Sequence, residues 1–231
     1  MSVTADDLPI KRTSTPDQVA AVIRSRVLSG EYRSGMPLRE VQLATAMGVS
    51  RNTVREGMRI LVTQGLLQHH VHRGVVVAVL DADDITDIYE ARRQLERLAI
   101  EQISHDESSD VLFDQLDGLV VDMEEAAAAS SWSELEDLDY AFHRLIVSNL
   151  GSQRLSSFFA TLLTESRLGL LLLDTMQEEP GGWVSEHRVL IEKLRARRSA
   201  EAIAIVERHL SKAKADVLDV AAKAASKPGG S

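Results

Sequence analysis

The sequence predicts a mainly α-helical protein, with an N-terminal winged helix-turn-helix and a C-terminal all-α helical bundle. Three observations predict this class. Proline occurs only 5 times in 231 residues and aromatic residues make up 4%, which favours helices over a β-sandwich. Near residue 80, three short helical segments and a β-branched run give way to helical periodicity alone. The charge balance changes at the same place.

Charge is distributed unevenly along this chain of net charge −9. Residues 1–79 contain 10 Lys and Arg against 6 Asp and Glu, whereas the remainder contains 16 against 29. A basic head on an acidic body is typical of a protein in which only one domain meets phosphate, and chance variation in surface charge is the alternative. The apolar content of 44% is enough for a packed core.

Several classes of protein are disfavoured. The chain has no cysteine, so it forms neither disulfides nor thiolate metal sites. Its polar N-terminus does not resemble a signal peptide, and its longest apolar run, LGLLLL at 168–173, is too short to span a bilayer. We expect a soluble, cytoplasmic protein.

The N-terminal elements predict a winged helix-turn-helix over residues 16–80, after a disordered arm at 1–15. TPDQVAAVIRSRVLSGEY opens with Thr-Pro and predicts a helix that ends at Gly30. REVQLATAMG and VSRNTVREGMRILVTQG predict two more helices, each ended by its glycine. LLQHH and VVVAVL, joined by the turn VHRG, predict a two-stranded hairpin.

The second helix of the helix-turn-helix is expected to enter the DNA major groove with its N-terminal residues on base edges. This turn combines short hydrogen-bonding side chains with two guanidinium groups, which suit phosphates and purine edges. Ser50 is also a good helix N-cap, so capping alone is the alternative for that residue. The candidate DNA-binding residues are Ser50, Arg51, Asn52, Thr53 and Arg55.

The segment GMPLREVQLATAMGVSRNTVREGMRILVTQGLL, followed by RGVVV, resembles the head of the GntR transcriptional regulators. The resemblance implies the same groove residues and makes Gly74 the wing tip near the minor groove. Arg73 beside it is a candidate minor-groove or phosphate contact, or else a solvated turn cation. Gly57 stands where alanine is common, and we expect it to loosen the recognition helix, at a cost of about 0.5–1 kcal/mol.

Three histidines gather at the expected wing, namely His69, His70 and His72. A metal site there is the alternative to surface polar residues that touch DNA. Because the hairpin offers no fourth ligand, the surface interpretation is favoured.

From residue 81 to 222 the sequence predicts an all-helical domain, followed by a disordered tail at 223–231. Polar or glycine-containing breaks separate its helices. The helices are expected near residues 83–104, 108–130, 133–149, 152–176, 183–197 and 199–222.

Three histidines of this domain, His143, His187 and His209, fall on apolar helix faces, and Asp139 lies one turn before the first. An unpaired buried imidazole costs about 1–3 kcal/mol, so each needs a partner. Three imidazoles and one carboxylate suit Zn²⁺ or Ni²⁺. Scattered core histidines, each with its own partner, are the alternative.

An all-helical body behind a GntR head looks like the FCD subclass, the FadR-like ligand domain. Many members hold a metal with Asp-x-x-x-His on one helix and a histidine on each of two later helices, as DYAFH, SEHRVL and ERHL do here. The resemblance implies a divalent metal, Zn or Ni, on Asp139, His143, His187 and His209. It also implies open coordination positions that an effector carboxylate can fill.

Two arginines are candidate effector-binding residues. Arg92, in YEARRQLE, matches an arginine that often lines the family's cavity, and a salt bridge with Glu96 is its alternative. Arg167 is the second candidate, with pairing to Glu165 or Asp174 as the alternative. Ser152 stands where the family usually has asparagine, which puts the effector chemistry in question.

Together these features predict a DNA-binding transcriptional regulator, a repressor, controlled by a small organic acid bound near the metal. The family generally works as a homodimer on a palindromic operator. No catalytic residues are assigned. The alternatives are a regulator whose metal is purely structural, and a metal-dependent enzyme for which Glu186 is the only candidate base.

Overall fold

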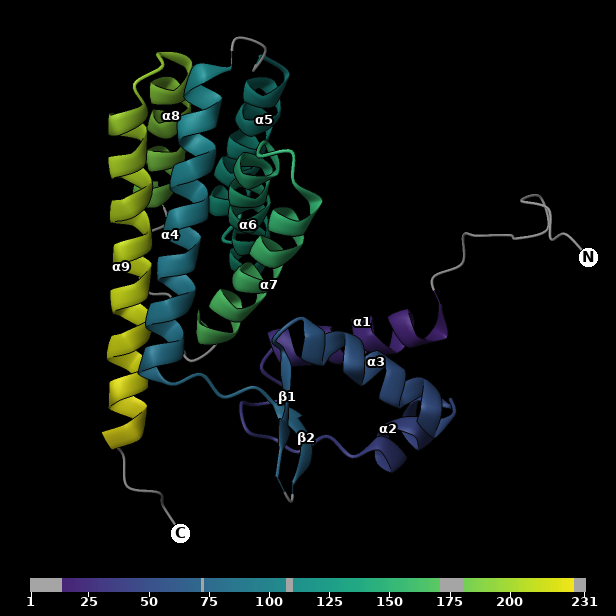
Figure 1. Cartoon of the computed structure of the whole chain (residues 1–231). Coiled ribbons are helices and arrows are strands. Elements are labelled where there is room, and N and C mark those ends of the chain that lie inside the picture. The colour runs from purple at the N-terminus through teal and green to yellow at the C-terminus, as the bar shows by residue number, and fades with distance from the viewer. Residues whose placement is uncertain (1–13, 72, 107–109, 171–180, 227–231) are drawn as a thin grey trace, which may run out of the picture. The chain divides into compact units, whose positions relative to one another are not determined.

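The computed structural model describes residues 14–71, 73–106, 110–170 and 181–226, which form nine helices and one two-stranded sheet. The chain divides into two compact units, Met1–Val79 and Leu80–Ser231, each described here by itself. Of the predicted disordered segments, residues 1–13 and 227–231 lie outside the described residues. Figure 1 shows the helices of each unit.

The N-terminal unit consists of three helices and a hairpin. Helix α1 (Thr15–Leu28) starts with a capping box, in which the Ser14 hydroxyl accepts the Asp17 amide proton and the Asp17 carboxylate accepts that of Ser14. Helix α2 (Glu40–Met47) ends at Gly48, whose φ of 65° favours glycine. Helix α3 (Arg51–Thr63) is the predicted recognition helix.

Gly57 lies where α3 packs against α1, a close contact that the sequence analysis did not anticipate. A Cβ atom at this position would stand 2.8 Å from Val19 Cγ1 and 2.9 Å from the Pro16 carbonyl oxygen. Both distances are shorter than van der Waals contact. The lack of a side chain at Gly57 therefore allows the two helices to approach closely.

The wing is an antiparallel hairpin of β1 (Leu67–His70) and β2 (Gly74–Val77), in which Leu67 pairs with Val77 and His70 with Gly74. The segment before α2 adds to the outer edge of β2, since Pro37 forms a bridge with Val76. Gly74 has a φ of 78°, a conformation that glycine adopts without strain. The hairpin is one residue shorter at its start and three at its end than the sequence predicts.

The described residues of the C-terminal unit form helices joined by short turns. Helix α4 packs against α9, α7 and α6, while α5 packs against α6 and α8 (Figure 1). An apolar core runs through the bundle and includes Ile100, Leu116, Phe142 and Phe159, all fully buried. The helices are α4 (Ala82–His105), α5 (Asp110–Ala128), α6 (Trp132–Ser148), α7 (Gln153–Leu170), α8 (Gly181–Arg195) and α9 (Ser199–Ser226).

Two helix ends differ from the predicted bounds. Helix α9 continues to Ser226, four residues beyond the predicted end, because the sequence to that point contains alanine and lysine and no helix breaker. Helix α7 is described to Leu170, and the rest of its predicted span lies outside the described residues. Among the helices the structure describes, none is long and apolar enough to cross a membrane.

Candidate functional site

Three helices bring the predicted metal ligands together in the C-terminal unit. Asp139 and His143 lie one turn apart on α6, His187 lies on α8 and His209 on α9. The Nε2 atoms of His143, His187 and His209 are 3.5, 3.0 and 3.9 Å from Asp139 Oδ1. The three imidazole centroids are 5.3–5.6 Å apart. The structure thus joins all four residues around one carboxylate oxygen.

This geometry suits a single metal ion. Ligand atoms about 2.1 Å from one ion are separated from each other by roughly 3.0–3.4 Å, close to the distances around Asp139 Oδ1. The ligand atoms of Asp139, His143 and His209 all lie within 4.8 Å of one another. His187 does not belong to that set, although its Nε2 atom lies 3.0 Å from Asp139 Oδ1. Within the described part of the chain, Asp139 Oδ1 and His143 Nε2 are buried and complete no hydrogen bond. Coordination would satisfy both atoms.

The charges in this cluster depend on burial and on neighbouring groups. Burial alone would raise the pKa of Asp139, yet His143 and the other imidazoles hold it well below its usual range. Burial disfavours the charged His143 ring, but Glu96 and Asp139 outweigh it and raise its pKa to about 9. Burial lowers the pKa of His209 to about 3. An ionised Asp139 and a neutral His209 are the forms that coordinate a metal, whereas metal binding to His143 must displace the Nε2 proton.

Glu96 supports the cluster from α4, a role that the sequence analysis missed. Its Oε2 atom lies 2.6 Å from His143 Nδ1, and its Oε1 atom accepts a hydrogen bond of 3.3 Å from Arg92 Nε. The salt bridge considered as the alternative for Arg92 is therefore present. An available signal was that Glu96 shares its face of the helix with Ile85, Ala99 and Ile103, a position that buries a charged residue.

Two tyrosines surround Arg92, which is itself 3% exposed. The guanidinium lies over the Tyr89 ring, 5.6 Å from its centroid, and interacts electrostatically with Tyr140 and Asp139. Burial raises the pKa of Tyr89 to about 12 and raises that of Tyr140 as well. Among the described residues, both hydroxyls are buried without a hydrogen-bond partner. Sequence reasoning did not identify either tyrosine, and YEARR alone gave no reason to do so.

Arg167, on α7, contacts acidic residues at the start of α6. It forms ion pairs with Asp137 and, at 3.7 Å, with Glu136. These partners are neither Glu165 nor Asp174, the residues considered from sequence, and Asp174 lies outside the described residues. Ser152 accepts the Leu155 amide proton at 3.4 Å and so caps α7.

On the N-terminal unit, the predicted groove residues occupy the first turns of α3. Ser50 is the N-cap, and its hydroxyl accepts the Thr53 amide proton at 3.1 Å. Asn52 is exposed, as is Arg51 with 64% of its side chain. Arg55 makes a bidentate ion pair with Glu40 of α2, at 2.9 and 2.8 Å. Capping is thus observed for Ser50, and Arg55 is positioned by an acid on the neighbouring helix.

Arg73 and Gly74 lie at the tip of the wing, where both are exposed. The Arg73 amide donates to the His70 carbonyl oxygen at 3.1 Å, which closes the turn. His69 and His70 belong to β1, and both are exposed. His72 lies outside the described residues, so the three-histidine wing site is not described.

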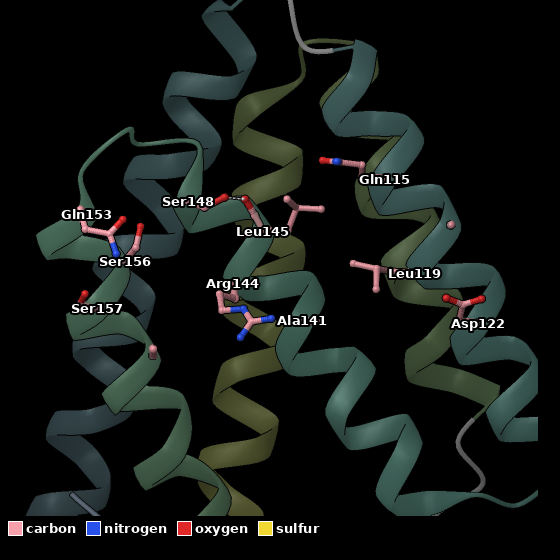
Figure 2. A pocket seen from close by; sticks show the side chains of 12 residues that line it. Gln115, Leu119, Asp122, Ala141, Arg144, Leu145, Ser148, Gln153, Ser156 and Ser157 are labelled. Atoms are coloured by element: carbon pink, nitrogen blue, oxygen red, sulfur yellow. Dashed lines mark hydrogen bonds between the residues drawn. The ribbon is translucent and has the colours of Figure 1, made fainter. Parts of the chain in front are cut away.

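A separate groove of about 750 Å³ lies on the C-terminal unit between α5, α6 and α7. Figure 2 shows Arg144 of α6 between Leu119 and Asp122 of α5 and Ser157 of α7. None of the residues that line this groove belongs to the metal cluster or to the surroundings of Arg92. The groove is therefore distinct from the candidate metal centre.

Two sequence families match the two units. Residues 15–77 match the family of bacterial regulatory proteins called gntR, and residues 87–212 match the FCD domain. The second match covers more than half of the chain.

Relatives with sequence similarity are regulators by name. The HTH-type transcriptional regulator YdhC of Bacillus subtilis (strain 168) is 28% identical over 184 residues, which cover 78% of this chain and 80% of the relative. The gluconate operon transcriptional repressor of Bacillus licheniformis is 30% identical over 141 residues, 61% of this chain and 57% of the relative.

Solved structures share the fold. A GntR transcriptional regulator from Rhodococcus sp. RHA1 superposes with a TM-score of 0.76 at 27% identity, covering 88% of this chain and 97% of that one. The structure of McbR/YncC from E. coli gives the same TM-score at 18% identity, covering 90% and 99%, and shows the fold alone.

These matches confirm the predicted fold class and the prediction that the chain is a regulator and not an enzyme. The winged helix-turn-helix implies binding to double-stranded DNA. The chain belongs to the GntR family of bacterial transcriptional regulators, and its C-terminal unit is an FCD domain.

Proposed function

We propose that this regulator represses transcription from a palindromic operator as a homodimer, and that a small organic acid controls its operator affinity. The acid binds beside a divalent metal, Zn or Ni, held by Asp139, His143, His187 and His209. Dimers are usual in the family, and two-fold symmetry matches two half-sites on a duplex. The names of relatives that repress sugar-acid and sugar operons support the sign of regulation.

The observation that carries the metal half of the proposal is the convergence of three imidazoles on one carboxylate oxygen. Residues from three helices supply these groups, and two of the inward-facing atoms lack hydrogen bonds among the described residues. Scattered core histidines would lie apart, whereas these three rings meet at Asp139 Oδ1. Imidazole and carboxylate ligands favour borderline divalent ions.

The effector half rests on Arg92, Tyr89 and Tyr140. A guanidinium and two phenol hydroxyls are all donors, and they are buried near Asp139. Burial of two hydroxyls that lack partners among the described residues costs free energy, which an acidic ligand would recover by accepting hydrogen bonds from them. The bound metal would attract the carboxylate group of the same ligand.

Arg167 is a weaker candidate for the effector site. Its ion pairs with Glu136 and Asp137 hold α7 to α6 and occupy its guanidinium. A structural role explains these contacts without a ligand.

In the DNA complex, Arg51, Asn52, Thr53 and Arg55 would contact the major groove, with Ser50 close to the phosphates. Arg73 and Gly74 would approach the minor groove from the wing. The ion pair with Glu40 fixes Arg55 in the free protein, so a base or phosphate must compete with that carboxylate.

A regulator with a purely structural metal is the second candidate. It is favoured by burial of the set, since His143 and His187 are 1% and 3% exposed and four protein ligands can close a zinc site. This alternative leaves the donors around Arg92 without a role.

Titration with organic acids tests the effector proposal. Operator affinity is measured by fluorescence anisotropy for the metal-loaded wild type, Arg92→Met and Arg97→Met, with mono- and dicarboxylic acids. Arg97 lies on the same helix but is half exposed and pairs with Glu101, which makes it a matched control. We expect at least one acid to change the operator affinity of the wild type and of Arg97→Met equally. The same acid should change the operator affinity of Arg92→Met much less. Equal responses in all three proteins would contradict the role of Arg92.

A further inference from the structure

Glu96 is a fully buried carboxylate that is neither a proposed metal ligand nor part of the DNA-binding surface. Its side chain is 0% exposed, and the charged groups it contacts in the described residues are Arg92 and His143. A lone carboxylate in such a place is costly, because burial disfavours its charge unless partners compensate. Its two contacts indicate what it does.

The first contact fixes the orientation of His143. Glu96 Oε2 accepts a hydrogen bond from His143 Nδ1 over 2.6 Å, so the proton stands on that nitrogen. The opposite atom, Nε2, faces Asp139 Oδ1 at 3.5 Å. With Nδ1 donating to the carboxylate, Nε2 is the nitrogen left for a metal ion, which would displace any proton carried there. Glu96 therefore selects both the tautomer and the direction of the ring.

The second contact holds Glu96 itself. Its Oε1 atom lies 3.3 Å from both Nε and Nη2 of Arg92, one helical turn away. The guanidinium compensates the buried negative charge and keeps the carboxylate aligned with His143. One side chain thus touches a metal ligand on one side and the proposed effector arginine on the other.

We infer that Glu96 is the positioning residue of the metal centre, which holds His143 with Nε2 directed at the ion and joins that ligand to Arg92. The inference rests on the metal site of the proposed function. Removing a carboxylate that orients a metal-bound histidine typically lowers metal affinity by roughly 10–100-fold.

The test measures Zn²⁺ affinity by competition with a chromophoric chelator. The proteins are the full-length wild type, Glu96→Gln, His143→Ala and the double variant. Glu101→Gln is the control, since Glu101 is a half-exposed acid on the same helix that pairs with Arg97. We expect Glu96→Gln to lose roughly 10–100-fold in affinity and Glu101→Gln to match the wild type.

The double variant separates positioning from a general structural effect. If Glu96 acts through His143, the double variant binds Zn²⁺ no more weakly than His143→Ala. If the two substitutions instead lowered the Zn²⁺ affinity by independent factors that multiply in the double variant, the inference would be overturned. An unchanged Zn²⁺ affinity in Glu96→Gln would also overturn it. A wild type that binds no Zn²⁺ would instead overturn the metal site itself.

A second measurement needs no variant at all. Long-range ¹H–¹⁵N NMR of the Zn²⁺-loaded wild type, with labelled histidine, reports which ring nitrogen carries the proton. We expect His143 to be protonated at Nδ1 and metal-bound at Nε2. Coordination through Nδ1 would overturn the inference.

Discussion

At the scale of single residues, the candidate metal centre depends on buried atoms that need a partner. Asp139 Oδ1, His143 Nε2 and the hydroxyls of Tyr89 and Tyr140 all lack hydrogen bonds within the described structure. Groups of this kind cost about 1–3 kcal/mol each when they stay unpaired. The proposed metal would satisfy the first two atoms, and the proposed acidic effector would satisfy the hydroxyls.

The tyrosine hydroxyls give a stability prediction. We expect Tyr140→Phe to stabilise the metal-loaded, effector-free protein by about 1 kcal/mol, because it removes a buried polar group without leaving a cavity. Urea denaturation measures this difference. Tyr32→Phe is the control, since the Tyr32 hydroxyl accepts a hydrogen bond from Arg26, and it should not stabilise. Destabilisation by Tyr140→Phe would mean that its hydroxyl already has a partner.

The recognition helix gives a binding prediction. Arg51→Ala should weaken operator binding by about 1–3 kcal/mol if Arg51 makes the proposed bidentate contact to a base edge. The exposed side chain of Arg51 forms a long 3.9 Å ion pair with Glu40, so we expect no change in thermal stability. Electrophoretic mobility shifts at fixed salt measure the affinity. Unchanged affinity with unchanged stability would remove Arg51 from the interface.

At the scale of elements, close packing of α1 on α3 depends on Gly57. Gly57→Ala should destabilise the N-terminal unit by about 1–3 kcal/mol, because the new methyl group overlaps Val19 and the Pro16 carbonyl. Gly118→Ala is the matched control in α5, where among described residues no atom lies within 4 Å of the added Cβ. It should stabilise by about 0.5–1 kcal/mol. Chemical denaturation measures the free energy of unfolding of both variants. A higher stability of Gly57→Ala than of the wild type would contradict the close packing of α1 on α3.

The elements also show how far sequence alone could go. Apolar periodicity and glycine stops predicted the helices and hairpin, since these signals are local. That Asp139, His143, His187 and His209 lie together was predictable, because the first two are four residues apart on one helix and the family resemblance supplied the others. Glu96, Tyr89 and Tyr140 were not predicted as parts of the site, because their roles arise from contacts between α4 and α6. The close contact of Gly57 with α1 was not predicted for the same reason, since helix propensity describes a residue within its own helix and not its contacts with another.

At the scale of the whole molecule, the two units differ in charge and in their expected response to metal removal. Metal at about 100 times its Kd stabilises a binding protein by about 2.7 kcal/mol. For a unit of this size that corresponds to roughly 5–10 °C in melting temperature. A chelator should therefore lower the transition of the FCD domain and leave that of the DNA-binding unit unchanged. Calorimetry that shows no shift in either transition would contradict metal-dependent stability.

The central claim is that three helices of the FCD domain hold one metal ion. Elemental analysis of tag-free protein tests it most directly, with His143→Ala beside the wild type and His105→Ala as a control, since His105 ends α4 outside the cluster. We expect about one equivalent of Zn or Ni in the wild type and the control, and its loss from His143→Ala. A folded wild type that holds no metal, even after metal is added back, would contradict it.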